Sequence, residues 1–249
     1  MANPVVSVII PAYNSGPYLA DALRSVFKQN YQPMEVIVVD DGSTDETASI
    51  ARSFKDITYT FQPNQGPASA RNTGIGMAHG DFIAFLDADD YWPENKLRTQ
   101  VSHLIENPET EVVLGRIQCT GLLTDKEKEN IRFEKPDNTM INVCLGSGIF
   151  KKSVFDKVGF FDESLRYYED HDWFLRAREQ KITMIILRQV TLLNRRHGNS
   201  ISHKRKKTDP TMIQILKKSL ERRRCKNNGY APLLRNFFDH DEGRAFRKK

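Results

Sequence analysis

A chain of 249 residues with 39% hydrophobic and 28% charged residues is typical of a soluble globular protein with one large α/β domain, or one domain plus an appendage. It holds no apolar run of about 18 residues, which argues against a membrane-spanning helix, and its start does not resemble a secretory signal. The three cysteines, Cys119, Cys144 and Cys225, predict neither a disulfide framework nor a zinc site, so we expect a cytoplasmic protein.

Charge is unevenly distributed along the chain. Residues 203–249 carry 15 Lys and Arg against 5 Asp and Glu, whereas the rest of the chain carries 22 against 27. The basic runs 204–207 and 222–224 could contact acidic lipid headgroups, and a solvated helical face is the alternative interpretation. No nucleic-acid-binding motif accompanies this charge, so we expect no nucleic acid among the partners.

The first 110 residues alternate predicted strands and helices. Short runs of β-branched and aromatic residues predict strands at 5–10, 36–39, 57–61 and 82–86. Helical spacing and start signals predict helices at 18–27, from Ser43 onward, at 66–78 and at 93–106, with Ser43 and Glu46 in a capping-box pattern. Repeated strand–helix units imply a mainly parallel sheet sandwiched by helices.

The signals weaken after residue 111. We predict strands at 112–121, 183–187 and 190–194, a surface loop at 124–138, and helices at 153–158, 172–179 and 211–224. The last helix has apolar residues assigned to one face: Met212, Ile215, Leu216 and Leu220. We therefore predict an α/β domain over 1–202, with halves 1–110 and 111–202, and a basic helical extension over 203–249.

Three polar segments follow predicted strands, at 11–14, 40–42 and 87–90. In open α/β sheets, ligands bind beyond the carboxyl ends of the strands, so we expect these segments to meet at one edge. The carboxylates of Asp87, Asp89 and Asp90 would be costly to hold together unless a cation binds there. Mg²⁺ or Mn²⁺ bridging a diphosphate fits such a set, and capping of the helix predicted at 93 is the alternative.

Other residues at this edge have two interpretations each. Asp41 could accept hydrogen bonds from a nucleobase or ribose, or could order the turn at Gly42. Tyr13 could stack on a base, or be a half-buried aromatic at the end of a strand. Arg71 could neutralise a phosphate, or form an ion pair between elements.

Several segments together resemble the family-2 inverting glycosyltransferases with the GT-A fold. The matching segments are VIIPAYN at 8–14, VVDDGSTD at 38–45, ARNTG at 70–74, FLDADD at 85–90, VGFFDE at 158–163 and EDHDW at 169–173. They occur in the order expected of the family, and the resemblance spans residues 4–201. Residues 202–249 match no family pattern.

The resemblance implies roles for individual residues. Asp41 would recognise the nucleobase, and Asp89, with Asp87 or Asp90, would hold the metal on the diphosphate. His197 would reach back to the same metal, and Asp170 would be the general base. The donor-binding set implied in this way is Pro11, Tyr13, Asp41, Arg71, Asp87 and Ala88, and the metal set is Asp89, Asp90 and His197.

The implied reaction moves a sugar, carried by UDP in most cases, to a hydroxyl of a glycan or lipid-linked acceptor. Displacement in one step would invert the anomeric centre, with Asp170 accepting the proton. A helix N-terminus favoured by the dipole is the alternative reason for the acids at 169–172, and Trp173 is expected in the core. A nucleotidyltransferase and a non-catalytic sugar-nucleotide-binding scaffold remain alternative functions, and oligomerisation stays open.

Overall fold

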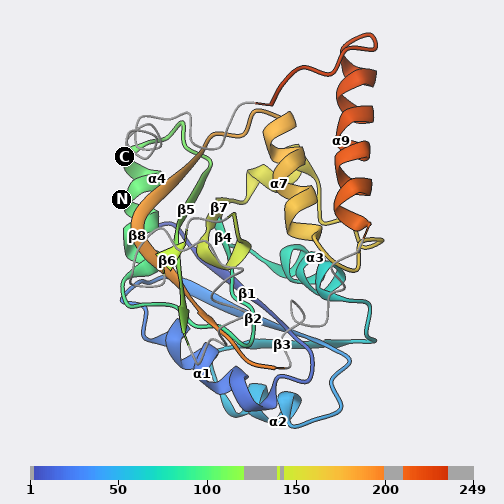
Figure 1. Ribbon diagram of the computed structural model, residues 1–249. Coiled ribbons are helices and arrows are strands. Elements are labelled where there is room, and N and C mark those ends of the chain that lie inside the picture. The colour runs from blue at the N-terminus through green and yellow to red at the C-terminus, as the bar shows by residue number, and fades with distance from the viewer. Residues whose placement is uncertain (1–2, 121–138, 141–142, 199–209, 235–249) are drawn as a thin grey trace.

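The computed structural model describes residues 3–120, 139–140, 143–198 and 210–234 (Figure 1). The loop predicted at 124–138 and the basic run at 204–207 lie outside these residues.

An eight-stranded sheet forms the centre of the molecule. Its strands are β1 (Val6–Ala12), β2 (Met34–Asp41), β3 (Thr58–Gln62), β4 (Phe82–Phe85), β5 (Val112–Thr120), β6 (Thr139–Met140), β7 (Ile149–Lys151) and β8 (Met184–Arg195). The order is β3-β2-β1-β4-β7-β5-β6, and β8 pairs with β5. Strands β1 to β4 pair in parallel, as do β5 and β8, whereas β6 and β7 pair antiparallel to their neighbours. The sheet is therefore continuous across the predicted boundary at residue 110.

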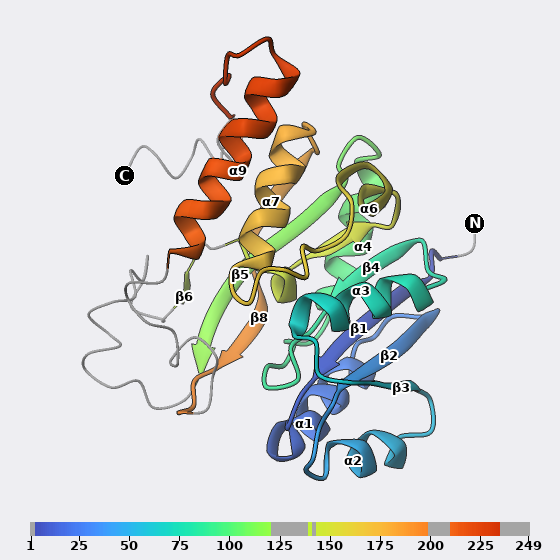
Figure 2. The ribbon, with the colours of Figure 1, turned by 90° about the vertical axis from the view of Figure 1, so that its right-hand side faces the viewer.

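Helices cover both faces of this sheet (Figures 1 and 2). They are α1 (Gly16–Phe27), α2 (Thr47–Ser53), α3 (Pro67–Met77), α4 (Lys96–Glu106), α6 (Ser153–Val158), α7 (Glu169–Glu179) and α9 (Thr211–Lys226), with a 3₁₀ turn η1 (Leu145–Ser147). Alternate residues of β1 face opposite ways, so that Val8 and Ile10 join the core under α1, α2 and α4, whereas Ile9 joins the core under α3, α6 and α7. The predicted α/β class with a sandwiched sheet is confirmed.

Several predicted boundaries are wrong, among them the start of α7, which lies at Glu169 rather than at residue 172. Helix α2 begins at Thr47 rather than at Ser43, because the Thr47 amide donates to Asp45 Oδ1 at 3.0 Å while the Ser43 hydroxyl serves another loop. Helix α4 begins at Lys96 rather than at residue 93, because Asn95 has a left-handed conformation with φ 62°. The two strands predicted at 183–194 are one strand, β8, whose irregularity is absorbed by register shifts against β5.

Helix α3 packs closely on β1. A Cβ at Gly74 would lie 2.4 Å from Ile9 Cγ2, so this helix position admits only glycine. The core beneath is aromatic: Trp173 is fully buried, as expected, against Phe150, Phe155 and Phe161. This packing fixes α3 and α7 beside each other above the ends of β1 and β4.

Helix α9 lies alongside α7 on the outside of the molecule in both views (Figures 1 and 2). The helix predicted at 211–224 is thus present, two residues longer than expected. No helix in the described ranges has the length and apolar content needed to cross a membrane.

Candidate active site

The loop after β1 is fastened to the loop after β2. The Asn14 amide donates to Ser43 Oγ at 2.9 Å, the Thr44 amide donates to Asn14 Oδ1 at 2.8 Å, and the Gly16 amide donates to Asp45 Oδ2 at 2.9 Å. These contacts explain the polar residues at 43–45 better than a capping box does. They hold two of the three predicted polar segments side by side at the carboxyl edge of the sheet.

The carboxylate of Asp41 is a buried hydrogen-bond acceptor at this edge of the sheet. It is 3% exposed and accepts hydrogen bonds from Gln62 Nε2 at 2.8 Å, the Gln65 amide at 3.0 Å and the Gly66 amide at 2.8 Å. Three of its hydrogen-bonding positions are therefore occupied by its own chain. The turn at Gly42 is instead ordered by Asp40, whose Oδ1 accepts a hydrogen bond from the Ser43 amide at 2.9 Å. The contacts of Asp41 bring the β3–α3 loop against the end of β2.

Tyr13 is the exposed member of the predicted donor set. Its side chain is 53% exposed, next to Asn14, whose φ of 46° turns the chain away from the strand. Pro11 lies partly buried in β1, and Ala88 is 4% exposed beside the acidic cluster. An exposed aromatic ring above a polar floor is a suitable surface for a base to stack on.

Arg71 joins three elements at one point. Its guanidinium is bonded to Asp87 Oδ1 at 2.7 Å and to Glu169 Oε1 at 2.5 Å, so it links α3 to the segment after β4 and to the start of α7. Burial opposes the charge of Arg71, but the carboxylates of Asp87 and Glu169 raise its pKa. The residue is 6% exposed, and the geometry corresponds to the inter-element ion pair rather than to a free phosphate ligand.

Asp89 and Asp90, in the acidic segment at 87–90, have different hydrogen-bond partners. Asp89 Oδ2 lies 3.0 Å from His197 Nε2. Asp90, 4% exposed, instead accepts hydrogen bonds from Asn194 Nδ2 at 3.0 and 3.1 Å and from the Arg195 amide at 2.8 Å. Asp90 therefore connects this segment to the end of β8, whereas Asp89 faces His197. The His197 ring packs against the tilted ring of Tyr18, with 4.3 Å between the centroids.

This segment carries unbalanced negative charge. Burial and then the charge of Asp87 raise the pKa of Asp89, although His197 opposes the shift. Burial and then the charges of Asp89 and Asp87 raise the pKa of Asp90 well above its ordinary value. A divalent cation would relieve both effects, so the residues fit a metal.

The protein alone does not complete a metal cage. In the described ranges, no three or more His, Cys, Asp or Glu side chains come together as a metal site. His197 Nδ1 is buried without a hydrogen-bond partner there, and His197 Nε2 faces Asp89. Mg²⁺ in phosphate-binding sites uses one or two carboxylates and takes its other ligands from phosphates and water. Asp89 is such a carboxylate, and His197 adds a nitrogen ligand, which suits a transition metal better.

Asp170 lies in the first turn of α7, directly after Glu169. Its Oδ1 accepts a hydrogen bond from the His171 amide at 2.7 Å and lies 2.7 Å from His171 Nδ1. Burial opposes ionisation, but the hydrogen bonds and charge of His171, with the charge of Arg71, lower the pKa of Asp170. Burial raises the pKa of the neighbouring Glu169. Asp170 is therefore ionised at neutral pH and its side chain is 26% exposed, as a general base requires.

The sequence model of glycosyl transferase family 2 matches residues 7–162 of the chain. The chain belongs to this family. An uncharacterized glycosyltransferase of Rickettsia typhi is 35% identical over 196 residues, which are 72% of this chain and 61% of the relative. The minor teichoic acid biosynthesis protein GgaA of Bacillus subtilis is 31% identical over 186 residues, 68% of this chain and 42% of that protein. The chain thus spans less than two thirds of these relatives.

Solved glycosyltransferase structures share the fold. S. aureus TarS 1–349 in complex with UDP-GlcNAc superposes with a TM-score of 0.72 at 21% identity, covering 88% of this chain and 66% of that one. The mannosyltransferase PcManGT from Pyrobaculum calidifontis, in complex with GDP-Man and Mn²⁺, has a TM-score of 0.63 at 22% identity, covering 93% and 67%. The fold of this chain is therefore of the GT-A type.

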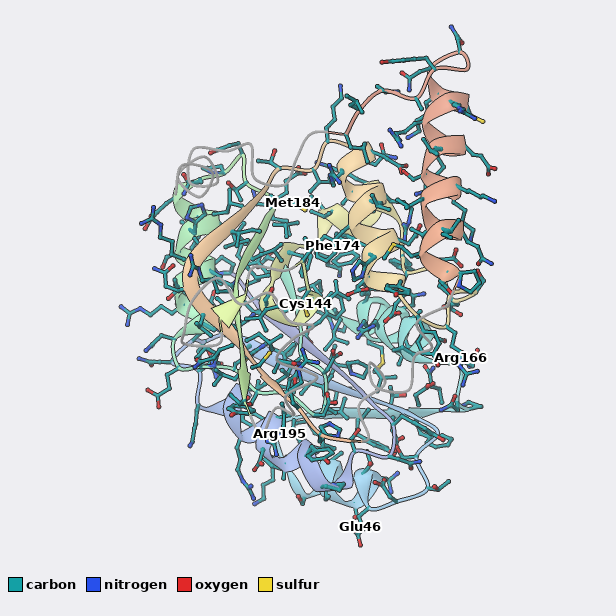
Figure 3. All side chains as sticks on the ribbon, in the orientation of Figure 1. Glu46, Cys144, Arg166, Phe174, Met184 and Arg195 are labelled. Atoms are coloured by element: carbon teal, nitrogen blue, oxygen red, sulfur yellow. The ribbon has the colours of Figure 1, made fainter. Side chains whose placement is uncertain are left out.

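The sequence analysis did not single out Cys144 as a neighbour of the candidate site. Burial, followed by the negative charges of Asp87, Asp170 and Asp90, raises the pKa of the Cys144 thiol. The thiol therefore lies within electrostatic reach of both the acidic segment and Asp170, and Figure 3 shows it in the middle of the molecule. The position of Cys144 before a Gly-Ser-Gly segment was the available signal.

The segment at 146–148 is held from behind by buried side chains. Its carbonyl oxygens accept hydrogen bonds from Trp92 Nε1, Lys96 Nζ, Gln100 Nε2 and Thr191 Oγ1, at 2.8 to 3.0 Å. Lys96 is 2% exposed and lies 4.0 Å from the centroid of the Trp92 ring; burial lowers the pKa of Lys96 well below its ordinary value. This support fixes the backbone that follows Cys144, and no sequence motif predicted it.

Proposed function

We propose that this glycosyltransferase moves a hexosyl or N-acetylhexosaminyl group from a nucleotide-diphosphate donor to an acceptor hydroxyl, with inversion and with the help of a divalent metal. The observation that carries the proposal is the arrangement of the Asp89–His197 pair, the Arg71 bridge and Asp170 at one edge of the sheet. Separate sites for the leaving group and for the base are what a single displacement needs.

The donor is proposed to be a UDP-sugar used in cell-surface glycan or polysaccharide synthesis. TarS is solved with UDP-GlcNAc, PcManGT with GDP-Man and Mn²⁺, and GgaA is named for minor teichoic acid biosynthesis. A glycan or lipid-linked acceptor is consistent with these relatives. A cytoplasmic location, the domain division at residue 202 and the oligomeric state stay predictions from the sequence.

On the donor side, Tyr13 would stack on the base above the floor that Asp41 organises, and Pro11 and Ala88 would line the pocket. Asp89 and His197 would hold Mn²⁺ or Mg²⁺, which offsets the charge that grows on the departing diphosphate. Asp90 would act by fixing the acidic segment to β8, and Arg71 by fixing Asp87 to α7. These two roles replace the direct metal and phosphate contacts expected from the sequence.

On the acceptor side, Asp170 would accept the proton of the attacking hydroxyl. Its Oδ1 is taken by His171, so Oδ2 is the oxygen that we assign to the acceptor. The hydroxyl oxygen forms the new bond to the anomeric carbon as the bond to the diphosphate breaks, and the proton moves to Oδ2. One carboxylate base without a second nucleophile fits a single displacement, and hence inversion.

Thermal unfolding with Mn²⁺ and a panel of nucleoside diphosphates tests this assignment. A diphosphate at about 100 times its dissociation constant should add about 2.7 kcal/mol to the stability of the wild type. Asp89→Asn should lose the Mn²⁺-dependent part of this shift, whereas Asp56→Asn, at an exposed position, should keep it. Absence of any shift in the wild type would contradict the donor site, and with it both the proposed transfer and the sugar-nucleotide-binding scaffold.

A further inference from the structure

The inner face of α9 is fixed to the body of the protein. Ile215 is fully buried and Ser219 is 1% exposed. Lys218 Nζ donates to Asp162 Oδ2 at 2.8 Å, and this contact helps to lower the pKa of Asp162 to about 2 against the opposing effect of burial. This face therefore has its partners within the same chain.

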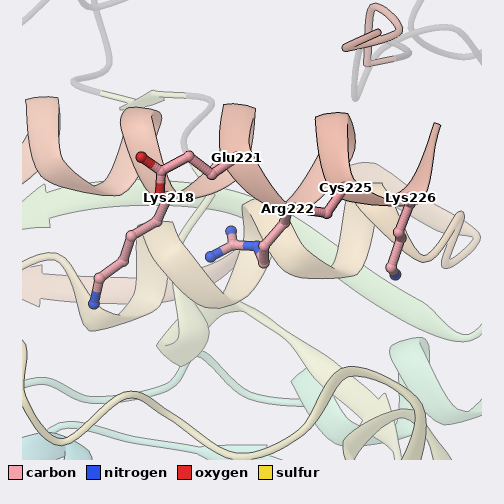
Figure 4. A pocket seen from close by; sticks show the side chains of 5 residues that line it. All are labelled: Lys218, Glu221, Arg222, Cys225 and Lys226. Atoms are coloured by element: carbon pink, nitrogen blue, oxygen red, sulfur yellow. The ribbon is translucent and has the colours of Figure 1, made fainter. Parts of the chain in front are cut away.

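Arg222 continues the same row of contacts one turn further along the helix. Its Nε and Nη2 donate to Glu179 at 2.8 and 3.0 Å, and Nη1 lies 3.5 Å from Asp172 Oδ1. A shallow hollow runs along this side of the helix (Figure 4). It is lined by Lys218, Glu221, Arg222, Cys225 and Lys226. Lys218 and Arg222 therefore lie on the inner side of α9. Their acidic partners are on α7 or in the segment before it.

The sequence analysis assigned the apolar residues of α9 to one face of the helix. In the structure they lie on different faces. Ile215 points inward, whereas Ile213, Leu216 and Leu220 are 59%, 48% and 38% exposed. Their spacing of three and four residues places these three side chains in one row along the helix. We call this row the outer stripe.

Exposed apolar surface is concentrated in this part of the molecule. Among the described residues, ten large hydrophobic side chains are exposed, and five of them lie between 213 and 233. Scattered exposed apolar residues are normal, but a row on one helix face indicates a surface that is covered in use.

Positive charge borders the outer stripe. Lys217 and Arg224 lie three or four residues from Leu220 and are exposed, and neither forms an ion pair with another described residue. The whole helix holds six Lys and Arg residues and one acidic residue, Glu221. Since the acidic partners of α9 lie under its inner face, the outer face presents apolar and cationic groups together.

We propose that the outer stripe of α9 docks on an anionic membrane surface, lying in the plane of the lipid headgroups. Leucine and isoleucine side chains would enter the interface while Lys217 and Arg224 contact lipid phosphates or carboxylates. A second copy of the chain fits less well, because like-facing stripes would bring Lys217 and Arg224 against the same cations. Docking would hold α7, one helix away, close to a lipid-linked acceptor.

Co-sedimentation of the full chain with vesicles tests this proposal. The vesicles contain phosphatidylcholine with or without phosphatidylserine, at low and high salt. The wild type should bind only the vesicles with phosphatidylserine and should be released by salt. Leu216→Ser with Leu220→Ser, and separately Lys217→Gln with Arg224→Gln, should each weaken binding roughly tenfold or more. Gln214→Ser with Lys226→Gln, away from the outer stripe, is the matched control.

Three results would overturn the proposal. One is a wild type that stays in solution with phosphatidylserine vesicles at low salt. Another is unchanged binding by the double serine variant, since charge alone would then explain the attachment. The third is a wild-type dimer, seen by light scattering, that the double serine variant converts to a monomer. Unfolding temperatures and diphosphate-induced shifts are recorded for every variant, so that misfolding and failure of the donor site are recognised separately.

Discussion

The regions before and after residue 110 hold their candidate site residues by different means. At the carboxyl ends of β1 and β2, Asn14, Asp41 and Asp45 are fixed by short hydrogen bonds to neighbouring loops, many of them to backbone amides. In the other half, Asp170 stands at the start of α7. That helix is held by the burial of Trp173 and Phe174 in the core and by ion pairs of Glu169, Asp172 and Glu179 to α3 and α9. The proposed donor edge is therefore organised by nearby loops, whereas the position of the proposed base depends on contacts between residues far apart in the sequence.

This difference predicts that the two halves fail separately. Substitution of Asp170 should leave donor binding unchanged. Substitutions that break the ion pairs of α7 should displace Asp170 without changing the loops that would bind the nucleotide. Arg71 is the exception, because it belongs to the first half and holds Glu169 of the second.

The largest expected effect is on turnover. Asp170→Asn should lower kcat by about 10² to 10⁴ because the general base is lost. The diphosphate-induced unfolding shift should be unchanged, since no donor contact is removed. Steady-state kinetics and thermal unfolding of the same preparation measure both quantities. If turnover and donor binding fall together, the separation of the halves is wrong.

The next effect is on stability. Arg71→Met removes a buried cation from between Asp87 and Glu169, and should lower the free energy of unfolding by about 3 to 5 kcal/mol. Arg24→Met breaks an exposed pair with Asp21 and should cost about 1 kcal/mol or less. Urea unfolding gives both values, and equal losses would show that Arg71 does not bridge the halves.

A smaller effect is expected where α9 meets α7. Arg222→Gln should lower the free energy of unfolding by about 1 to 3 kcal/mol, because two hydrogen bonds to Glu179 are lost and Asp172 loses a nearby charge. Hydrogen exchange should quicken in α7 and remain unchanged in α3. Lys226→Gln, at an exposed position on the same helix, is the control; equal exchange in both variants would contradict the account.

The smallest effect depends on pH. The folded pKa of Asp162 is lowered to about 2, with Lys218 among the causes. A lowered pKa contributes stability above the unfolded value, and this contribution is lost as pH falls through the folded value. The stability difference between wild type and Asp162→Asn should thus be constant above about pH 5 and shrink toward pH 2. A difference that grows on acidification would contradict the Lys218 contact.

Much of the first half could be predicted because its signals are local. Buried β-branched runs predict β1 and β2, and the convergence of 11–14, 40–42 and 87–90 follows from the parallel sheet. The sequence could not show that Ser43 and Asp45 bond to Asn14 and Gly16 instead of only capping their own helix. Local patterns do not reveal which of several available acceptors a loop amide will use.

The second half was harder to predict because its contacts are long-range. The Arg71–Glu169 pair joins residues 98 positions apart, and the outward turn of Leu216 depends on α9 docking through Ile215. The one local signal for Cys144, its position just before the Gly-Ser-Gly segment at 146–148, does not reveal that the charges of Asp87 and Asp170 act on its thiol. Asp90 looked equivalent to Asp89 in the sequence, and only the fold shows that Asn194 and Arg195 occupy it.

The central claim is that Asp89 and His197 together hold a metal on the donor diphosphate. The most direct test measures UDP affinity by calorimetry for wild type and His197→Gln, each with Mn²⁺ and with EDTA. The account predicts a loss of about 10- to 100-fold with Mn²⁺, the range seen when the surroundings of a metal ligand are damaged, and no loss in EDTA. Equal losses in both conditions, or none with Mn²⁺, would contradict it.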